Sequence, residues 1–76
     1  MGIDNALRKG ITVFGRRYRY PSWAAHITVD RFGNIKACSG IPSERTDGTW
    51  NYHTNRVEYI GSTGMKSPQK IQVCPA

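Results

Sequence analysis

The residues most able to do chemistry in this sequence are the arginines and tyrosines of the segment 8–20, RKGITVFGRRYRY. The segment holds five of the eleven basic residues of the chain and no acidic residue. Successive side chains of an extended strand point to opposite faces, so Arg17 and Arg19 would share one face and Tyr18 and Tyr20 the other. Guanidinium groups bind phosphates and aromatic rings stack on bases, so this pattern predicts a contact with nucleic acid.

We expect the basic residues of this segment to contact phosphates and Tyr18 to stack on a base. The predicted nucleic-acid-binding residues are Lys9, Arg16, Arg17, Tyr18 and Arg19. The alternative is that Tyr18 and Tyr20 are half-buried core residues and that the arginines form a solvated face. Arg8, Lys66 and Lys70 would extend the basic surface if the fold places them beside the predicted nucleic-acid-binding residues.

Two histidines and a glutamate supply groups for acid–base catalysis. Together with arginines that stabilise phosphate, His26, His53 and Glu58 are the residue types needed for metal-independent RNA cleavage. Their spacing does not favour catalysis over the alternative, in which the two histidines are surface polar residues and Glu58 pairs with a cation on a neighbouring strand. The sequence contains no glycine-rich phosphate loop, GxSxG or HExxH motif. We therefore predict a binding protein that is not an enzyme.

The same histidines and the two cysteines are the residue types of a Cys₂His₂ zinc site. His26, Cys38, His53 and Cys74 follow one another at intervals of 12, 15 and 21 residues. Structural zinc sites usually pair their ligands roughly two to four residues apart, so we expect no metal and no other cofactor. Cys38 and Cys74 are either free thiols or a single disulfide. A cytoplasmic location, inferred below, favours free thiols.

The charge of the chain favours a polyanionic partner. Its formal net charge is +6 at pH 7, and no acidic residue occurs over residues 5–29. Such a field attracts nucleic acid, an acidic protein surface or anionic lipid, and charge alone does not choose among them. No apolar run approaches the ~18 residues of a membrane span, so no membrane partner is expected. The N-terminus lacks the apolar stretch of a secretion signal, and a cytoplasmic location is expected.

Short apolar alternations separated by turn residues predict antiparallel β structure after Gly10. The alternating runs are residues 11–14, 17–20, 26–30, 35–38, 50–52, 56–60 and 70–74. A helix of at most two turns is expected between Asp4 and Lys9. We predict one all-β, mainly antiparallel domain over residues 1–76, with five to six short strands in a small bent sheet or a partly closed barrel.

The strongest local signal is the segment 30–34, DRFGN. Asp30 can accept hydrogen bonds from the backbone ahead of it, and Gly33 can adopt the left-handed conformation of a bulged hairpin. This hairpin would place Ile27 and Val29 on one face with the apolar residues of the return strand. The expected apolar pairs are Ile27 and Val29, Ile35 and Ala37, Trp50 and Tyr52, and Val57 and Tyr59.

A second function class rests on exposed side chains in turns and loops. Phe32 would face solvent at the hairpin tip, and residues 39–49 are polar and predict an exposed loop. A few aromatic or arginine anchors are typical of protein interfaces. The alternative function is a compact phage- or mobile-element-type inhibitor or adaptor that binds a host protein, including at that protein's own nucleic-acid groove. Its predicted anchors are Arg31, Phe32, Ile41 and Arg45.

The segment from Lys9-Gly10-Ile11 to Gly15-Arg16-Arg17-Tyr18 resembles the strand–turn–strand opening of small DNA-associated barrels in transposases and integrases. The resemblance is confined to this segment, contains no catalytic motif and assigns no family. Residue pattern and charge together predict a small basic accessory protein that binds nucleic acid through phosphates with little sequence readout.

Overall fold

The computed structural model describes residues 8–73, which form eight short antiparallel strands and no helix. The strands are β1 (Arg8–Val13), β2 (Arg16–Pro21), β3 (His26–Val29), β4 (Asn34–Cys38), β5 (Ser43–Glu44), β6 (Trp50–Asn51), β7 (Val57–Ser62) and β8 (Gln69–Gln72). The all-β, mainly antiparallel prediction is confirmed, but there are eight strands where five to six were expected, because β5 and β6 are two-residue strands. The expected N-terminal helix lies outside the described residues except for Arg8 and Lys9, which belong to β1. Over residues 8–73 there is thus no helix with the length and apolar character to cross a membrane.

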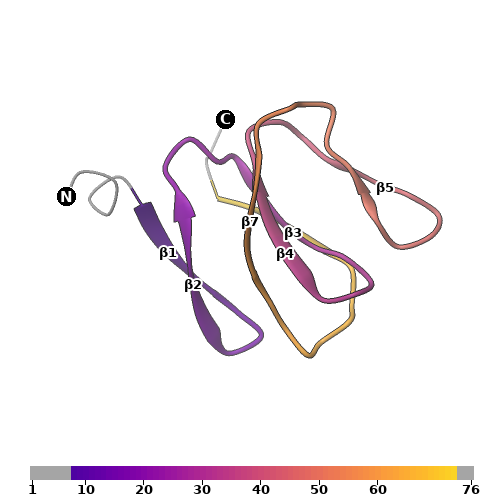
Figure 1. Ribbon diagram of the computed structural model, residues 1–76, viewed down its shortest axis with the longest axis horizontal. Coiled ribbons are helices and arrows are strands. Elements are labelled where there is room, and N and C mark those ends of the chain that lie inside the picture. Colours follow the sequence, from indigo (N-terminus) through magenta and orange to yellow (C-terminus); the bar gives the residue numbers. More distant parts are fainter. Residues whose placement is uncertain (1–7, 74–76) are drawn as a thin grey trace.

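The strands form three open sheets, and no barrel is closed. β1 pairs only with β2, the main sheet has the order β7-β4-β3-β8, and β5 pairs with β6. Figure 1 shows the β1–β2 hairpin on one side of the main sheet and the hairpin containing β5 on the other. The partly closed barrel is therefore ruled out, because the first hairpin packs on the face of the main sheet and does not extend its edge.

The β3–β4 hairpin forms as the sequence predicts. The carboxylate Oδ1 of Asp30 accepts hydrogen bonds from the backbone N–H groups of Phe32 and Asn34, at 2.9 and 3.0 Å. Gly33 has a φ of 83°, which few residues other than glycine adopt. The resulting register pairs Ile27 with Ala37 and Val29 with Ile35, so these four apolar side chains share one face.

The core lies between that face and the β1–β2 hairpin. The hairpin contributes Val13, Tyr18 and Tyr20, and the main sheet contributes Ile27, Val29, Ile35 and Ala37. The opposite face of β3 is also buried, because the chain after β4 folds over it. Trp50 donates its indole N–H to the carbonyl of Val29 at 2.9 Å. The segment 39–49, expected to be wholly loop, contains the short exposed strand β5. In this segment the Gly40 carbonyl oxygen lies beside the ring of His26, and the Gly48 carbonyl oxygen accepts a hydrogen bond from the backbone N–H of Arg31.

The prediction that Tyr59 faces inward with Val57 is wrong, because Tyr59 is 57% exposed. The register pairs Tyr59 with Lys36 and pairs Glu58 with the buried Ala37. Val57 and Tyr59 therefore lie on the face of the sheet away from the β1–β2 hairpin. A bulge between Ile35 and Lys36 then shifts the register.

Candidate nucleic-acid interface

The β1–β2 hairpin separates its cations from its aromatic rings. Arg19 pairs with Gly10 and Arg17 with Thr12, so these four residues share the outer face of the hairpin. All four are exposed. Tyr18 lies on the inner face, opposite Ile11. The alternation in the sequence thus predicted which residues point to solvent in this hairpin.

Gly10 makes room for one of these arginines. The position that a Cβ of residue 10 would occupy lies 3.3 Å from Cζ of Arg17 and in collision with its Nη2. The guanidinium therefore rests on the backbone of the neighbouring strand, where a larger side chain would displace it. Arg17 and Arg19 are two residues apart, so their Cα atoms lie about 6.8 Å apart along the strand. The outer face thus carries two neighbouring cations on a regular, hydrogen-bonded ribbon.

The two remaining cations of the predicted site lie at opposite ends of the hairpin. Arg16 pairs with Val13 next to the turn, and Lys9 pairs with Tyr20 near the start of β1. Both side chains are exposed. Both cations pair with buried inner-face residues, so by alternation their side chains leave the hairpin from the face opposite that of Arg17 and Arg19. Arg16 is next to Arg17 in the strand, and Lys9 lies diagonally across from Arg19, because its partner Tyr20 follows Arg19 directly.

Tyr18 belongs to the core and offers no open ring face for a base. Its side chain is only 9% exposed, and its hydroxyl donates a hydrogen bond to the carbonyl oxygen of Ser62 at 2.8 Å. The ring also packs against Gly61 of β7. This is the alternative that the sequence left open for Tyr18, and we leave the residue out of the interface proposed below.

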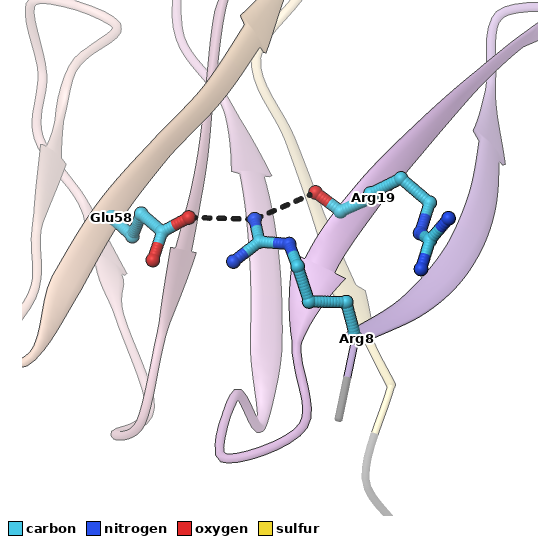
Figure 2. Close-up of polar contacts among 3 residues, drawn as sticks. All are labelled: Arg8, Arg19 and Glu58. Carbon is cyan, nitrogen blue, oxygen red and sulfur yellow. Dashed lines mark hydrogen bonds and ion pairs between the residues drawn. The ribbon is translucent and has the colours of Figure 1, made fainter. Parts of the chain in front are cut away.

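Arg8 connects the hairpin to the main sheet. Its Nη2 donates to Oε2 of Glu58 at 2.7 Å and to the carbonyl oxygen of Arg19 at 3.4 Å. Figure 2 shows Arg8 reaching toward Glu58 of β7, while the side chain of Arg19 extends away from that pair. Arg8 therefore has its charge partly neutralised, and Glu58 has the cationic partner that the sequence offered as the alternative to catalysis.

The structure does not bring the acid–base residues together. His26 is buried, and its Nδ1 lies 3.1 Å from the carbonyl oxygen of Gly40. His53 is exposed, and its Nε2 lies 2.5 Å from Oγ of Ser43. Glu58 faces the β1–β2 hairpin, on the other side of the main sheet from His26. These three residues thus do not form one site.

Cys38 is a buried free thiol, and burial raises its pKa above the ordinary value. Its Sγ lies 3.7 Å from the carbonyl oxygen of His26. Within residues 8–73 no three histidine, cysteine, aspartate or glutamate side chains are grouped to hold a metal ion. Cys74, the fourth residue of the zinc set considered from the sequence, lies outside the described residues.

Three of the four predicted protein anchors lie at one end of the molecule. Phe32 is 59% exposed at the β3–β4 turn, with Cζ of Arg31 5.1 Å from its ring centroid. Hydrogen bonds from the side chain and backbone of Thr49 lower the pKa of Asp47, with smaller effects from Arg45 and Arg31. Arg31 donates a hydrogen bond to the carbonyl oxygen of Asp47 at 3.2 Å, and the backbone N–H of Arg45 donates to the carbonyl oxygen of Thr49 at 2.8 Å, so both arginines lie beside the 47–49 segment.

The fourth anchor, Ile41, lies apart from the other three. It is 70% exposed and follows Gly40, whose carbonyl oxygen lies beside the ring of His26. His26 is the first residue of β3, whereas Phe32 lies in the turn after Val29, the last residue of β3. Ile41 is consequently at the opposite end of the β3–β4 hairpin from Phe32.

One exposed aromatic residue was missed from the sequence. Phe14 was assigned to the end of a strand, but it forms the two-residue turn between β1 and β2 with Gly15. The φ angles of these residues are 50° and 81°. A turn placed at Phe14-Gly15, between a strand ending at Val13 and a strand beginning at Arg16, would have predicted from the sequence that Phe14 is exposed.

Comparison of the chain with models of protein families, curated proteins and solved structures found no match.

Proposed function

We propose that this protein binds nucleic acid through the phosphate backbone, with the outer face of the β1–β2 hairpin as the contact surface. The observation that carries the proposal is the exposed pair Arg17 and Arg19, with Arg16 beside it at the turn. No acidic residue occurs in this hairpin. Phosphate oxygens are the ligands that such a row of guanidinium groups binds best.

The attachment of the hairpin to the core supports this role. The rings of Tyr18 and Tyr20 are buried against the main sheet, and they hold the outer face in a fixed orientation. Cations on a fixed strand lose less freedom on binding than cations on a mobile tail. Contacts to phosphate carry no sequence information directly, so we expect little sequence preference.

Salt dependence of binding tests the proposal. Each neutralised phosphate contributes roughly 0.7–0.9 to the slope of log K against log salt concentration. Replacing Arg16, Arg17 and Arg19 together by alanine should therefore flatten the slope by about two to three units. Arg8→Ala is the matched control, because Glu58 already pairs with that cation, and it should change the slope less than Arg17→Ala. An unchanged slope in the triple variant would place the contact elsewhere.

The tip of the β3–β4 hairpin favours a second candidate function, docking on a host protein. Phe32 is exposed, and the turn that presents it is fixed by the two hydrogen bonds to Asp30. A rigid exposed aromatic beside an arginine is typical of an interface anchor. If Phe32→Ala abolished binding to the partner while the triple arginine variant retained it, protein docking would replace nucleic-acid binding as the proposed function.

A further inference from the structure

The turn of the β1–β2 hairpin has an unusual residue in its first position. Phe14 has a φ of 50°, and Gly15 follows it with a φ of 81°. Two-residue turns with both φ angles positive favour asparagine, aspartate or glycine in that first position. A bulky aromatic side chain there is a conformational outlier that reduces stability. Such outliers are frequent at functional sites, so the ring of Phe14 calls for a functional explanation.

The surroundings of this turn are open and cationic. Phe14 is 37% exposed. A Cβ on Gly15 would meet no atom within 4 Å outside its neighbours in the chain, so the space beside the turn is free. Arg16 and Arg17 follow directly, and both are exposed. In Figure 1 this turn lies at the end of the β1–β2 hairpin.

We propose that the hairpin binds single-stranded nucleic acid, with one base stacked on Phe14 and the adjoining phosphates on Arg16 and Arg17. This inference rests on the proposed function and names its substrate class. A base within a duplex is already stacked on its neighbours, whereas an unpaired base has a free face for an aromatic ring. Stacking of this kind, combined with cations along the backbone, is the usual way in which proteins bind single strands without sequence preference.

The other exposed aromatic tip is less suited to this role. The guanidinium of Arg31 lies over the ring of Phe32, 5.1 Å from its centroid. The carbonyl oxygen of Asp47 accepts a hydrogen bond from Arg31 at 3.2 Å, so an acidic residue lies close by. That carboxylate repels phosphate, whereas the β1–β2 hairpin has no acidic residue. Phe32 therefore serves as the matched control for Phe14.

The test compares a fluorescent single strand of about 12 nucleotides with the duplex of the same sequence. Fluorescence anisotropy should show tighter binding of the single strand by the full chain. Phe14→Asn should weaken single-strand binding about 5- to 140-fold and change duplex binding by less than about 2-fold. Phe14→Trp should retain single-strand binding, and Phe32→Ala should not alter it.

Thermal unfolding of the same variants separates binding from folding. Asparagine tolerates a φ of 50°, so Phe14→Asn should be at least as stable as the parent protein. Phe14→Leu keeps an apolar side chain without a ring face and should lose binding as Phe14→Asn does. Full single-strand binding by either variant would overturn the stacking role while leaving the phosphate contact intact. Failure of both strands to bind at low salt would overturn the proposed function itself.

Discussion

The ring of Tyr18 lies directly on Gly61. A Cβ on residue 61 would come within 2.7 Å of two ring carbons, and the Tyr18 hydroxyl donates to the neighbouring carbonyl of Ser62. This contact attaches β2 to β7, although the two strands belong to different sheets. The orientation of the arginines on the outer face of the hairpin therefore depends on a contact made by its inner face.

Gly61→Ala should destabilise the protein by about 1–3 kcal/mol, because the added methyl group must displace the Tyr18 ring. Urea denaturation measures the change in the free energy of unfolding. Gly64→Ala is the control, since a Cβ there meets no atom within 4 Å. Equal stability of the two variants would show that the ring of Tyr18 does not rest on Gly61.

Two glycines of similar φ should respond differently to alanine. Gly33 and Gly15 have φ values of 83° and 81°, so both variants carry the cost of a left-handed residue, about 1–2 kcal/mol. A Cβ on Gly33 would also collide with the carbonyl oxygen of Thr63, whereas Gly15 has open space. Gly33→Ala should therefore be the less stable variant by a further 1–3 kcal/mol or so in chemical denaturation. The reverse order would contradict the tight approach of the 63–65 segment to this turn.

Glu58→Gln should strengthen nucleic-acid binding, because it removes the acidic partner of Arg8. One released cation can steepen the slope of log K against log salt by up to about 0.7–0.9. The change in stability should stay within about 1 kcal/mol, as for other partly exposed ion pairs. Glu44→Gln, on exposed β5 at the other side of the main sheet, should alter binding less. The same affinity in both variants would argue against a phosphate contact near Arg8.

Stability should fall as the pH rises above about 9. Burial raises the pKa of the Cys38 thiol above 9.0 and that of the Tyr52 hydroxyl above 10.0. Above those ordinary values the unfolded chain releases protons that the folded state still holds, and deprotonation therefore favours unfolding. The stabilising effect is complete below the ordinary pKa of each group and is lost as the pH passes the raised value.

Melting temperatures between pH 7 and 10.5 measure this loss. Cys38→Ala removes the thiol and should reduce the slope above pH 9, while Tyr52→Phe should reduce it mainly above pH 10. The comparison is between slopes, because either substitution also changes packing at neutral pH. A slope that neither variant alters would show that these two groups keep their ordinary pKa values in the folded protein.

The parts of the fold that were predictable are those specified by neighbouring residues. Asp30 and Gly33 specify a turn within five residues, and that turn determines which apolar side chains of β3 and β4 face each other. The position of the first hairpin was not predictable in this way. It packs on the face of the main sheet, and residues far apart in the sequence, such as Tyr18 and Gly61, determine this arrangement.

In the candidate interface, too, neighbouring residues made some features predictable, whereas other features depend on contacts between residues far apart in the sequence. Alternation placed Arg17 and Arg19 on one exposed face, as found. Alternation alone did not say whether Tyr18 was buried, because burial depends on what covers the inner face. Tyr59 was assigned to the wrong face, since only the register with β4 shows that Glu58 lies opposite Ala37. Short-range patterns thus identify which residues share a face, and long-range pairing decides whether that face is covered.

The strand order of the main sheet has a consequence for synthesis of the protein. β3 pairs on one side with β4, which follows it closely, and on the other with β8, at residues 69–72. While the nascent chain grows, that second edge of β3 has no partner until residues 69–72 emerge. An unpaired apolar edge is a template for pairing with another chain. We therefore expect a chain truncated before β8 to aggregate more readily than the full chain, because β3 then keeps an unpaired edge.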